Sequence, residues 1–349
     1  MERRASRRVT VGGVPLGGGA PVTVQSMLNC PAHDISGSVE QALRLERAGC
    51  QILRAAVPDR ASVPLVAALK EHCAIPIVAD IHFDYRLALE SVAAGADKIR
   101  INPGNIGSAE RVRQVAVACR AKGVPIRIGV NSGSLEAELL AKHGAPTPEV
   151  MVESALGHIR LLEDCDFGDI VVSLKSSGVE ATVQAYTLLA ARCDYPLHLG
   201  ITEAGTARMG LVKSAVGIGS LLLHGIGDTV RVSLTAAPEE EIAAASDILQ
   251  ALGLGGCRPN IISCPTCGRT RIDLIALARA VEERLAGSRK AVTVAVMGCA
   301  VNGPGEAREA DIGLAGGDGC VLLFRKGEIL RKIPESEALD ALMAEIEKL

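Results

Sequence analysis

The sequence predicts an α/β protein in which a (β/α)8 TIM barrel is followed by a smaller α/β domain. Short β-rich segments alternate with longer helical segments eight times over roughly the first 250 residues, as a closed barrel requires. The glycine-rich segment GLGGCRPN then interrupts the pattern, and the rest of the chain has strands and helices of its own. We therefore expect residues 1–255 to form the barrel and residues 256–349 to form the second domain.

The predicted barrel strands are rich in Val, Ile, Leu and Ala, which suits parallel strands that are buried on both faces. Their ranges are Pro21–Met27, Ile52–Val57, Ile77–His82, Lys98–Asn102, Ile126–Asn131, Asp169–Lys175, Leu197–Glu203 and Thr229–Leu234. The helical segments between them often end in Gly or Cys just before the next strand, as helix-to-strand connections commonly do. An open, doubly wound sheet is the alternative, but the first strand is not followed by the glycine-rich phosphate turn that such a sheet would need.

The second domain has its own secondary-structure pattern. The segments AVTVAVMG and GCVLLFRKGE have the composition of strands. The segments IDLIALARAVEERLAG and ESEALDALMAEIEKL have apolar residues at helical spacing. A small folded α/β domain is therefore expected after the linker.

The composition excludes several classes of partner. Aromatic residues make up only 2% of the chain and Trp is absent, which argues against a nucleic-acid binder that stacks bases. A net charge of −3 argues against a general affinity for nucleic acid or acidic membranes. The basic N-terminus has no apolar stretch behind it, and no segment is long and apolar enough to span a bilayer, so we expect a cytoplasmic protein. In that compartment the eleven cysteines are not a disulfide framework but buried side chains or metal ligands.

Polar and cationic side chains stand near the ends of seven of the eight predicted strands, where the active sites of TIM barrels are built. Residues two apart on a strand face the same side, which pairs Asp80 with His82. The candidate residues are Arg54, Asp80, His82, Arg100, Asn102, Arg127, Asn131, Lys175, Glu203, Arg231 and Ser233. Five cations this close together repel one another unless an anion holds them, and Arg suits bidentate contacts with phosphate. The barrel is therefore predicted to bind a diphosphate or polyphosphate.

Glu203 is the one isolated carboxylate among these cations. It is either a salt-bridge partner of one of the Arg side chains or a general acid or base. Asp80 and His82 supply only two metal ligands between them, which is too few for a metal site. Hydrogen bonding to a substrate is the better interpretation of that pair.

Three cysteines of the second domain have the spacing of metal ligands. Cys264 and Cys267 lie in a CPTC turn, and 31 residues separate them from Cys299. A lone CxxC motif is found in zinc sites, redox dithiols and clusters alike. A dithiol would need a βαβ context leading directly into the motif, and a structural zinc site would need four good ligands. Three thiolates instead fit a 4Fe-4S cluster in which one iron lacks a cysteine ligand.

Glu306 stands seven positions after Cys299, in the segment NGPGE, and is the candidate fourth ligand. The glycines and the proline of this segment allow the backbone to pass close to a cluster. A carboxylate is a harder and more exchangeable ligand than a thiolate, so this iron could take a substrate oxygen in its place. Cys257 and Cys320 are alternative ligands, and the cysteines of the barrel are expected to be packing residues.

Several segments of the chain occur together in a known family. The motifs VQSM, VADIHF, KIRINPGN, GVNSGSLE, LHLGITEAG, VKSAVGIGSLLLHGIGDTVRVSLT, SCPTCGRT and MGCAVNGPGEA span it nearly end to end. On these motifs the sequence resembles the bacterial 4-hydroxy-3-methylbut-2-enyl diphosphate synthases of the non-mevalonate isoprenoid pathway, in their compact two-domain form. The resemblance implies the reductive ring opening and dehydration of 2-C-methyl-D-erythritol 2,4-cyclodiphosphate, with ferredoxin or flavodoxin as the electron donor.

The resemblance also implies roles for individual residues. Glu203 would be the acid near the departing hydroxyl group, and the cluster ligands would be Cys264, Cys267, Cys299 and Glu306. The diphosphate would be held by Arg54, Arg100, Arg127, Lys175 and Arg231, with Asp80, His82, Asn102, Asn131 and Ser233 beside it. A head-to-tail homodimer is expected, in which the cluster domain of one chain caps the barrel of the other. The loop LNCPAHD after the first strand departs from the Thr-rich pattern of the family, which leaves its contacts with substrate open.

Two other functions remain as alternatives. A pterin-type barrel, as in the dihydropteroate synthases, would need neither iron nor a reductant. A zinc-stabilised binding module on an inert barrel would hold zinc and no sulfide. Metal content distinguishes these alternatives from the iron–sulfur enzyme.

Overall fold

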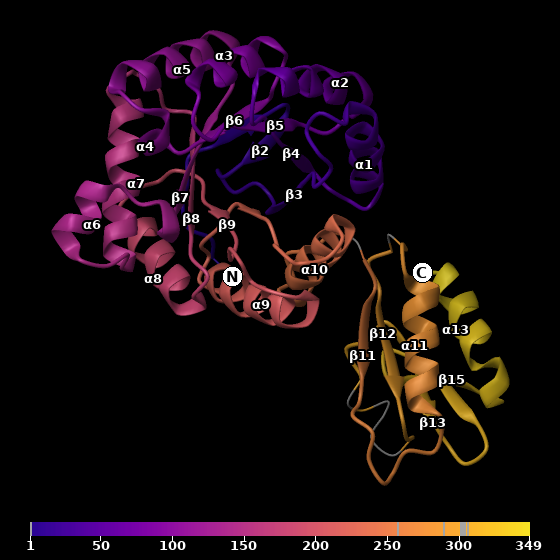
Figure 1. The fold of residues 1–349 in the computed structure, drawn as a ribbon. Helices are drawn as coiled ribbons and strands as arrows, with labels where there is room; N and C mark the ends of the chain where they lie inside the picture. Colours follow the sequence, from indigo (N-terminus) through magenta and orange to yellow (C-terminus); the bar gives the residue numbers. More distant parts are fainter. Residues whose placement is uncertain (1, 257, 289, 301–304, 306) are drawn as a thin grey trace. The chain divides into compact units, whose positions relative to one another are not determined.

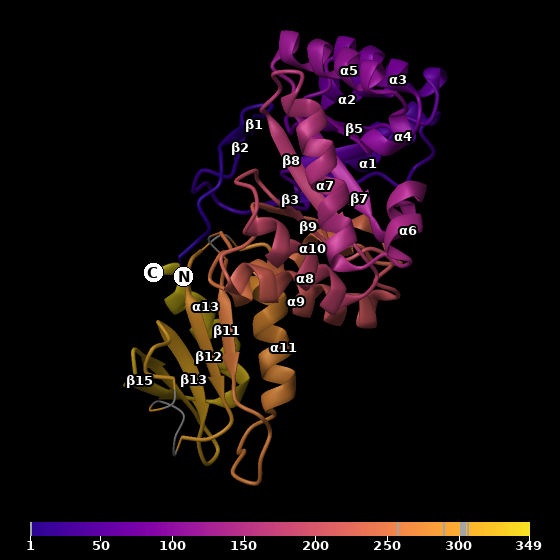
Figure 2. The same ribbon diagram turned by 90° about the vertical axis from the view of Figure 1, so that its left-hand side faces the viewer.

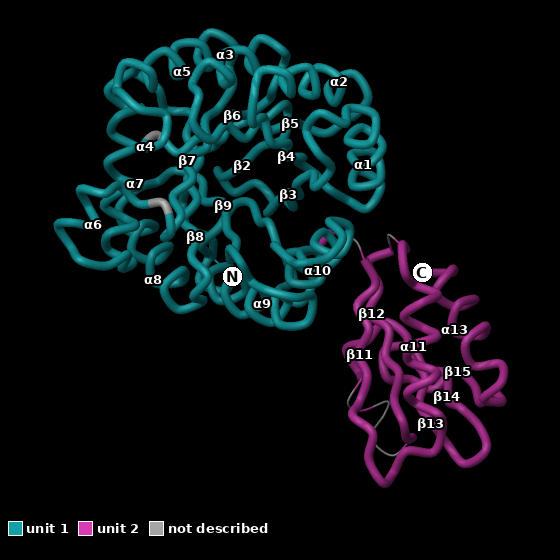
Figure 3. The backbone as a smooth tube through the Cα atoms, in the orientation of Figure 1, with its two compact units in different colours: residues 1–254 teal, residues 255–349 magenta. Residues whose placement is uncertain are grey.

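The computed structural model describes residues 2–256, 258–288, 290–300, 305 and 307–349. The chain divides into two compact units, Met1–Leu254 and Gly255–Leu349, which are coloured separately in Figure 3. This division falls one residue before the domain boundary expected from the sequence.

The first unit is a barrel of parallel strands with helices around it (Figure 1). The eight strands follow the order β8-β7-β6-β5-β4-β3-β10-β9, and a bridge between Val172 and Leu197 joins the two ends of this sheet. The strands are β3 (Thr23–Met27), β4 (Ile52–Ala56), β5 (Ile77–Asp80), β6 (Lys98–Ile101), β7 (Ile126–Asn131), β8 (Ile170–Lys175), β9 (His198–Leu199) and β10 (Thr229–Val230). The predicted TIM barrel is therefore confirmed.

A long helix follows each barrel strand and covers the outside of the sheet (Figure 1). These helices are α1 (Ile35–Arg47), α2 (Pro64–His72), α3 (Tyr85–Ala93), α5 (Ala109–Lys122), α7 (Pro148–Glu163), α8 (Val179–Ala190), α9 (Ala207–Leu223) and α10 (Pro238–Ala251). Shorter helical turns are η1 (Arg60–Ser62), α4 (Pro103–Ile106), η2 (Ser132–Ser134) and α6 (Ala137–His143). Among the helices that the structure describes, none is long and apolar enough to cross a membrane.

The seventh and eighth strands are much shorter than the sequence predicted. After Leu199 the backbone leaves the sheet, and Thr202 donates its N–H to the carbonyl of Ser176 in the loop that follows β8. After Val230 the chain also turns away, and the Leu234 N–H donates to the Glu241 carboxylate at 2.9 Å. The ends of both predicted strands are therefore loops held by hydrogen bonds to neighbouring loops and helices.

A hairpin of β1 (Val9–Val11) and β2 (Val14–Leu16) precedes the barrel and was not predicted. Gly12 and Gly13 form its two-residue turn with φ values of 51° and 90°, a conformation that favours glycine. The apolar side chains of the hairpin pack against Ile52, Val78 and Val171, which lie at or near the starts of their strands. The hairpin therefore closes the amino-terminal end of the barrel and leaves the opposite end for the site (Figure 2).

The barrel strands alternate between an outward apolar face and an inward polar face. In β6, Ile99 and Ile101 belong to the hydrophobic core beneath the helices, whereas Lys98 and Arg100 point the other way. The same alternation in the neighbouring strands turns their polar residues towards the centre of the barrel, here called the lumen. The lumen is thus lined with charged groups, although the barrel as a whole is rich in apolar residues.

The second unit is a five-stranded mixed sheet in the order β11-β12-β13-β14-β15. Its strands are β11 (Asn260–Ser263), β12 (Thr293–Met297), β13 (Ile312–Gly316), β14 (Val321–Arg325) and β15 (Glu328–Ile333). Helices α11 (Leu274–Leu285) and α13 (Ala338–Glu347) pack on one face, and the turn η3 (Glu335–Glu337) precedes α13. The predicted small α/β domain is present, with β11, β13 and β15 in addition to the strands expected from the sequence.

Candidate active site

Five cationic side chains point into the lumen from five strands or strand ends. They are Arg54, Arg100, Arg127, Lys175 and Arg231. Each is largely shielded from solvent, and Arg127 is only 1% exposed. The pKa of Arg127 and that of Lys175 are lowered well below their ordinary values, first by burial and then by the charges of the other cations. The structure therefore brings together all five cations that the sequence singled out.

Asp80, at the end of β5, is the carboxylate at the centre of this group. Its Oδ1 lies 3.1 Å from Nη1 of Arg100, and its Oδ2 lies 3.6 Å from Nε of Arg54. Burial alone would raise the pKa of Asp80, but the positive charges around it, those of Arg54 and Arg100 first, outweigh burial and lower it to about 2. Asp80 is therefore ionised at neutral pH and orients two guanidinium groups.

Arg231 has its own buried partner in Glu241 of helix α10. Nη2 of Arg231 lies 3.2 Å from Oε2 of Glu241, whose side chain is only 6% exposed.

Lys175 has no ion pair with any residue that the structure describes, and an added Cβ at Gly200 would lie only 2.8 Å from its Nζ. Gly200 thus leaves room for the Lys175 amine. The carboxylates of Asp80 and Glu241 do not balance the five cations, so the lumen has an excess of positive charge. That excess suits a polyanionic ligand.

Gly129 of β7 has the corresponding role for Arg100. An added Cβ at this position would lie 2.5 Å from Nε and 2.7 Å from Nη2 of Arg100. We expect Gly129→Ala to fold, because a guanidinium group rather than backbone must move, but to lower kcat/KM for the phosphorylated ligand at least tenfold, since misplaced groups cost about that much. Steady-state kinetics with a thermal unfolding curve measures both effects.

The matched control is Gly157→Ala in helix α7, where an added Cβ meets no atom within 4 Å. This variant should keep full activity and gain up to about 1 kcal/mol of stability from its better helix propensity. Equal kinetics for the two variants would show that the space at Gly129 does not matter to Arg100.

The remaining predicted residues lie around the carboxyl-terminal mouth of the barrel. Asn102 is buried and caps α4, where its side chain accepts the N–H of Gly104 at 3.1 Å. His82 is exposed, with Nε2 3.9 Å from Oδ2 of Asp80. Asn131 ends β7 and Ser233 follows β10, and both are partly buried. Asp80 and His82 are thus close together, although β5 ends at Asp80 and His82 lies in the loop that follows it.

Glu203 lies in the loop after β9 and is exposed to solvent. Among the residues that the structure describes, no cation forms an ion pair with it, so the salt-bridge alternative finds no support there. Its backbone has a φ of 51°, which is uncommon for a residue other than glycine. Strained backbone of this kind is often retained at functional sites.

Sequence reasoning missed several polar residues of the lumen, among them Lys98, His198 and Glu241. Lys98 and His198 are each 0% exposed, and Glu241 is 5% exposed. Lys98 could have been found from the spacing, because it lies two residues before Arg100 and so faces the same side. His198 begins the shortened β9, and Glu241 lies on a helix, so neither has a strand-end signal.

The three candidate cysteine ligands lie in loops at the carboxyl ends of the parallel strands of the second sheet. This end of the sheet, with Cys264, Cys267 and Cys299, is here called the cysteine edge. Cys264 follows β11 directly, Cys299 follows the parallel neighbour β12, and Gly298 donates its N–H to Sγ of Cys264 at 3.2 Å. Parallel strands end at the same edge, which brings the two cysteine loops side by side. The loop of Cys267 joins them, because the Arg271 N–H donates to the carbonyl of Gly298 at 2.9 Å.

Cys267 is exposed, while Cys264 and Cys299 are partly buried. Hydrogen bonds from the backbone and side chain of Arg269 lower the pKa of the Cys267 thiol, which favours the thiolate form that binds metals. Within the described part of the chain, no three His, Cys, Asp or Glu side chains are close enough to hold a metal ion. Glu306 and Cys257 lie outside the described residues, so the predicted ligand set remains a prediction.

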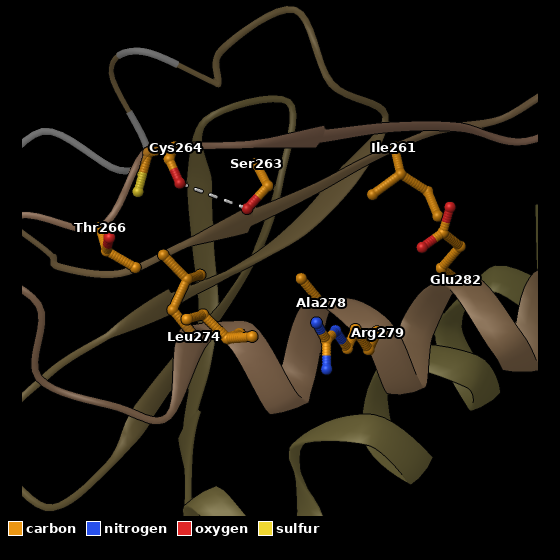
Figure 4. A pocket seen from close by; sticks show the side chains of 9 residues that line it. Ile261, Ser263, Cys264, Thr266, Leu274, Ala278, Arg279 and Glu282 are labelled. Carbon is orange, nitrogen blue, oxygen red and sulfur yellow. Dashed lines mark hydrogen bonds between the residues drawn. The ribbon is translucent and has the colours of Figure 1, made fainter. Parts of the chain in front are cut away.

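Cys264 also borders a pocket between β11 and helix α11 (Figure 4). Thr266 lies beside it, and Ile261 and Glu282 lie at the other end. The Ser263 hydroxyl donates to the carbonyl of Cys264 at 3.5 Å, which holds the backbone at this corner. One side of the cysteine edge is thus open rather than packed.

Family models match both units of the chain. The model described as GcpE TIM-barrel domain matches residues 6–246, and the model described as GcpE protein C-terminal domain matches residues 260–348. The chain belongs to the GcpE family. The resemblance inferred from its motifs is thereby confirmed.

Curated relatives of this family are similar over their full length. A 4-hydroxy-3-methylbut-2-en-1-yl diphosphate synthase (flavodoxin) of Geobacter sulfurreducens is 57% identical over 99% of this chain and 98% of its own. Proteins of the same name from Caldanaerobacter subterraneus and Clostridium perfringens are 55% and 54% identical, the latter over 100% of both chains.

Solved structures with the same barrel include dihydropteroate synthases. Those of Stenotrophomonas maltophilia and Yersinia pestis superpose with TM-scores of 0.52 and 0.51, at 17% and 15% sequence identity. They cover 71% and 70% of this chain, and 97% and 98% of their own. At such low identity the likeness concerns the barrel fold alone and does not favour a pterin-binding function.

Proposed function

We propose that this GcpE-family chain is a 4-hydroxy-3-methylbut-2-enyl diphosphate synthase. It opens the ring of 2-C-methyl-D-erythritol 2,4-cyclodiphosphate with two electrons and releases water. The observation that carries the proposal is the lumen, where five largely shielded cations meet two carboxylates, those of Asp80 and Glu241. The identity of 54–57% to synthases along the whole chain supports the same conclusion.

The cations bind and orient the diphosphate. The guanidinium groups of Arg54 and Arg100 are held by Asp80, so they present their remaining N–H groups without loss of further rotamer entropy. Arg127 and Lys175 lie deeper, where water is excluded and each contact with a phosphate oxygen is stronger. An anion also favours the charged form of Lys175, because an opposite charge nearby raises the pKa of an amine.

Glu203 is proposed to supply the proton that leaves with the hydroxyl group as water. Its loop follows β9 at the carboxyl end of the barrel, which is where the catalytic groups of this fold lie. The exposed position suits exchange of protons with solvent. His82, Asn102, Asn131 and Ser233 would hydrogen-bond the rest of the substrate.

The cysteine edge of the second unit is proposed to hold a 4Fe-4S cluster, which supplies single electrons to the reaction. The chemistry of the donors supports this, because Cys264, Cys267 and Cys299 come from adjacent loops and the lowered pKa of Cys267 favours its thiolate. A backbone N–H already donates to sulfur at Cys264, as is common around clusters. Glu306 is the proposed fourth ligand. Flavodoxin, named for the relatives, or ferredoxin is the proposed electron donor.

A head-to-tail homodimer in the cytoplasm is proposed as the working form. The cations lie in one unit and the cysteines in the other, so the reaction needs a barrel and a cysteine edge to meet. Helix α9 supports self-association, because its apolar side chains at helical spacing remain exposed. These are Met209, Val212, Val216 and Leu223, with exposures of 52%, 48%, 53% and 57%.

Metal analysis of anaerobically purified protein tests the proposal against its rivals. We expect about four iron and four sulfide per chain. One zinc and no sulfide would favour a zinc-stabilised module, and neither metal nor sulfide would favour a pterin-type barrel. Either of these results contradicts the proposed function.

A further inference from the structure

Lys98 and His198 form an ionisable layer inside the barrel, here called the inner layer. Lys98 begins β6 and His198 begins β9, and neither side chain has any exposed surface. Within the described residues, Nζ of Lys98 and both ring nitrogens of His198 lack a hydrogen-bond partner. Nε and Nη1 of Arg127, which lies on the strand next to Lys98, are also without one. Polar atoms this deeply buried are normally satisfied, so the inner layer requires an explanation.

The charged groups that act on the inner layer are cations. Arg127 and Arg54 act on Lys98, and these two act on His198 together with Lys175 and Lys98 itself. The pKa of Lys98 and that of His198 are lowered well below their ordinary values. Burial is the larger cause, and these positive charges are the second. The two carboxylates of the lumen are committed elsewhere, since Asp80 pairs with Arg54 and Arg100 and Glu241 pairs with Arg231.

An isolated buried charge costs far more than a neutral amine or imidazole at the same place. Burial and the neighbouring cations therefore favour the neutral forms of Lys98 and His198 in the ligand-free barrel. A doubly charged anion in the same lumen favours the protonated forms of Lys98 and His198 instead, because an opposite charge stabilises the protonated form of each group. Binding of the anion and uptake of protons are then linked, and each favours the other.

We propose that Lys98 and His198 are a proton-loading layer, neutral in the empty barrel and protonated from solvent when the diphosphate binds. This inference rests on the proposed function, because it needs a diphosphate in the lumen. Both residues act through the bound anion and the neighbouring cations, so they are positioning residues. Their protonation adds positive charge beneath the diphosphate when substrate is present and removes it when the lumen is empty.

Isothermal titration of the full-length, cluster-loaded protein with the cyclic diphosphate tests this, with no reductant present so that no turnover occurs. Each phosphorus of the cyclic compound has a single strongly acidic group, so the ligand itself takes up no proton near neutral pH. Binding enthalpies in buffers of different ionisation enthalpy give the number of protons gained. We expect about one proton or more per chain for the wild type.

Lys98→Met and His198→Gln should each lower this number by at least about half and weaken binding about tenfold, the effect of a change of one pKa unit. Lys98→Met should also raise the melting temperature of the ligand-free protein, because it replaces an unpaired buried amine with an apolar side chain of similar length. A purely structural role would not lower the proton number. Lys122→Met, which removes an exposed lysine of the same barrel, is the control and should change neither quantity.

The outcomes separate this inference from the proposed function. Tight binding to the wild type with no proton uptake in any buffer overturns the inference and leaves the function standing. The same follows if both variants, folded by their melting curves, keep the wild-type proton number. No binding of the cyclic diphosphate at all overturns the function and the inference together.

Discussion

Cys267→Ser should abolish turnover and most of the bound iron. A serine hydroxyl is a poor ligand for iron at neutral pH, and the change leaves the proposed site with only two thiolates. We expect iron and sulfide content to fall several-fold and activity to fall more than about a hundredfold, which exceeds the effect of losing an outer-shell partner. Iron and sulfide analysis, the visible absorption spectrum and turnover, all on anaerobic protein, measure the three effects.

Folding of the variant should be preserved, because Cys267 is exposed and lies outside the hydrophobic clusters of the second unit. Cys320→Ser is the matched control, since Cys320 is a partly buried cysteine of the same unit and an alternative ligand. It should keep both iron and activity. Loss of iron in Cys320→Ser together with full activity of Cys267→Ser would reverse the assignment of ligands.

Arg100→Met should lower affinity for the cyclic diphosphate about a hundredfold. The change removes a guanidinium group that Asp80 holds at 3.1 Å, and breaking a buried charge pair costs about 2–5 kcal/mol in binding. It also leaves Asp80 with Arg54 at 3.6 Å as its remaining close guanidinium partner. Calorimetric titration of the protein without reductant gives the affinity, and kcat/KM should fall by at least the same factor.

Two further variants separate charge from geometry. Arg100→Lys keeps the charge but loses the planar fork, and should recover only part of the affinity. Arg86→Met removes an exposed guanidinium group of the same barrel, paired with Asp84 at 3.1 Å, and should change affinity less than about twofold. If all three variants bound the ligand equally, the lumen could not be the diphosphate site.

Much of the barrel could be predicted from the sequence, because a buried parallel strand has a strong local signal. The first six predicted strands agree with the observed ones to within two residues at each end. The last two do not, since Thr202 and Leu234 find hydrogen-bond partners in a neighbouring loop and helix that no local pattern indicates. The first hairpin was missed although Gly-Gly between alternating apolar residues is a turn signal.

The sequence predicted those residues of the site that lie at or near the carboxyl ends of strands. The period of two along a strand identified Asp80 and Arg100, which the structure places 3.1 Å apart. Lys98 was missed although the same period of two relates it to Arg100. Glu241 was missed because it lies on a helix, and its burial depends on how α10 packs against the barrel. The spacing of Cys264, Cys267 and Cys299 indicated loops that the structure places side by side, but spacing alone cannot give the distances between sulfur atoms.

The central claim is that this chain reduces a cyclic diphosphate, and product analysis tests it most directly. Anaerobically purified, iron-loaded protein is incubated with 2-C-methyl-D-erythritol 2,4-cyclodiphosphate and reduced flavodoxin, and the phosphorus NMR spectrum is followed. We predict that the two signals of the cyclic diphosphate are replaced by those of a linear allylic diphosphate, only when reductant is present. Unchanged substrate in the complete mixture, or an acyclic product that forms equally without reductant, would contradict the account.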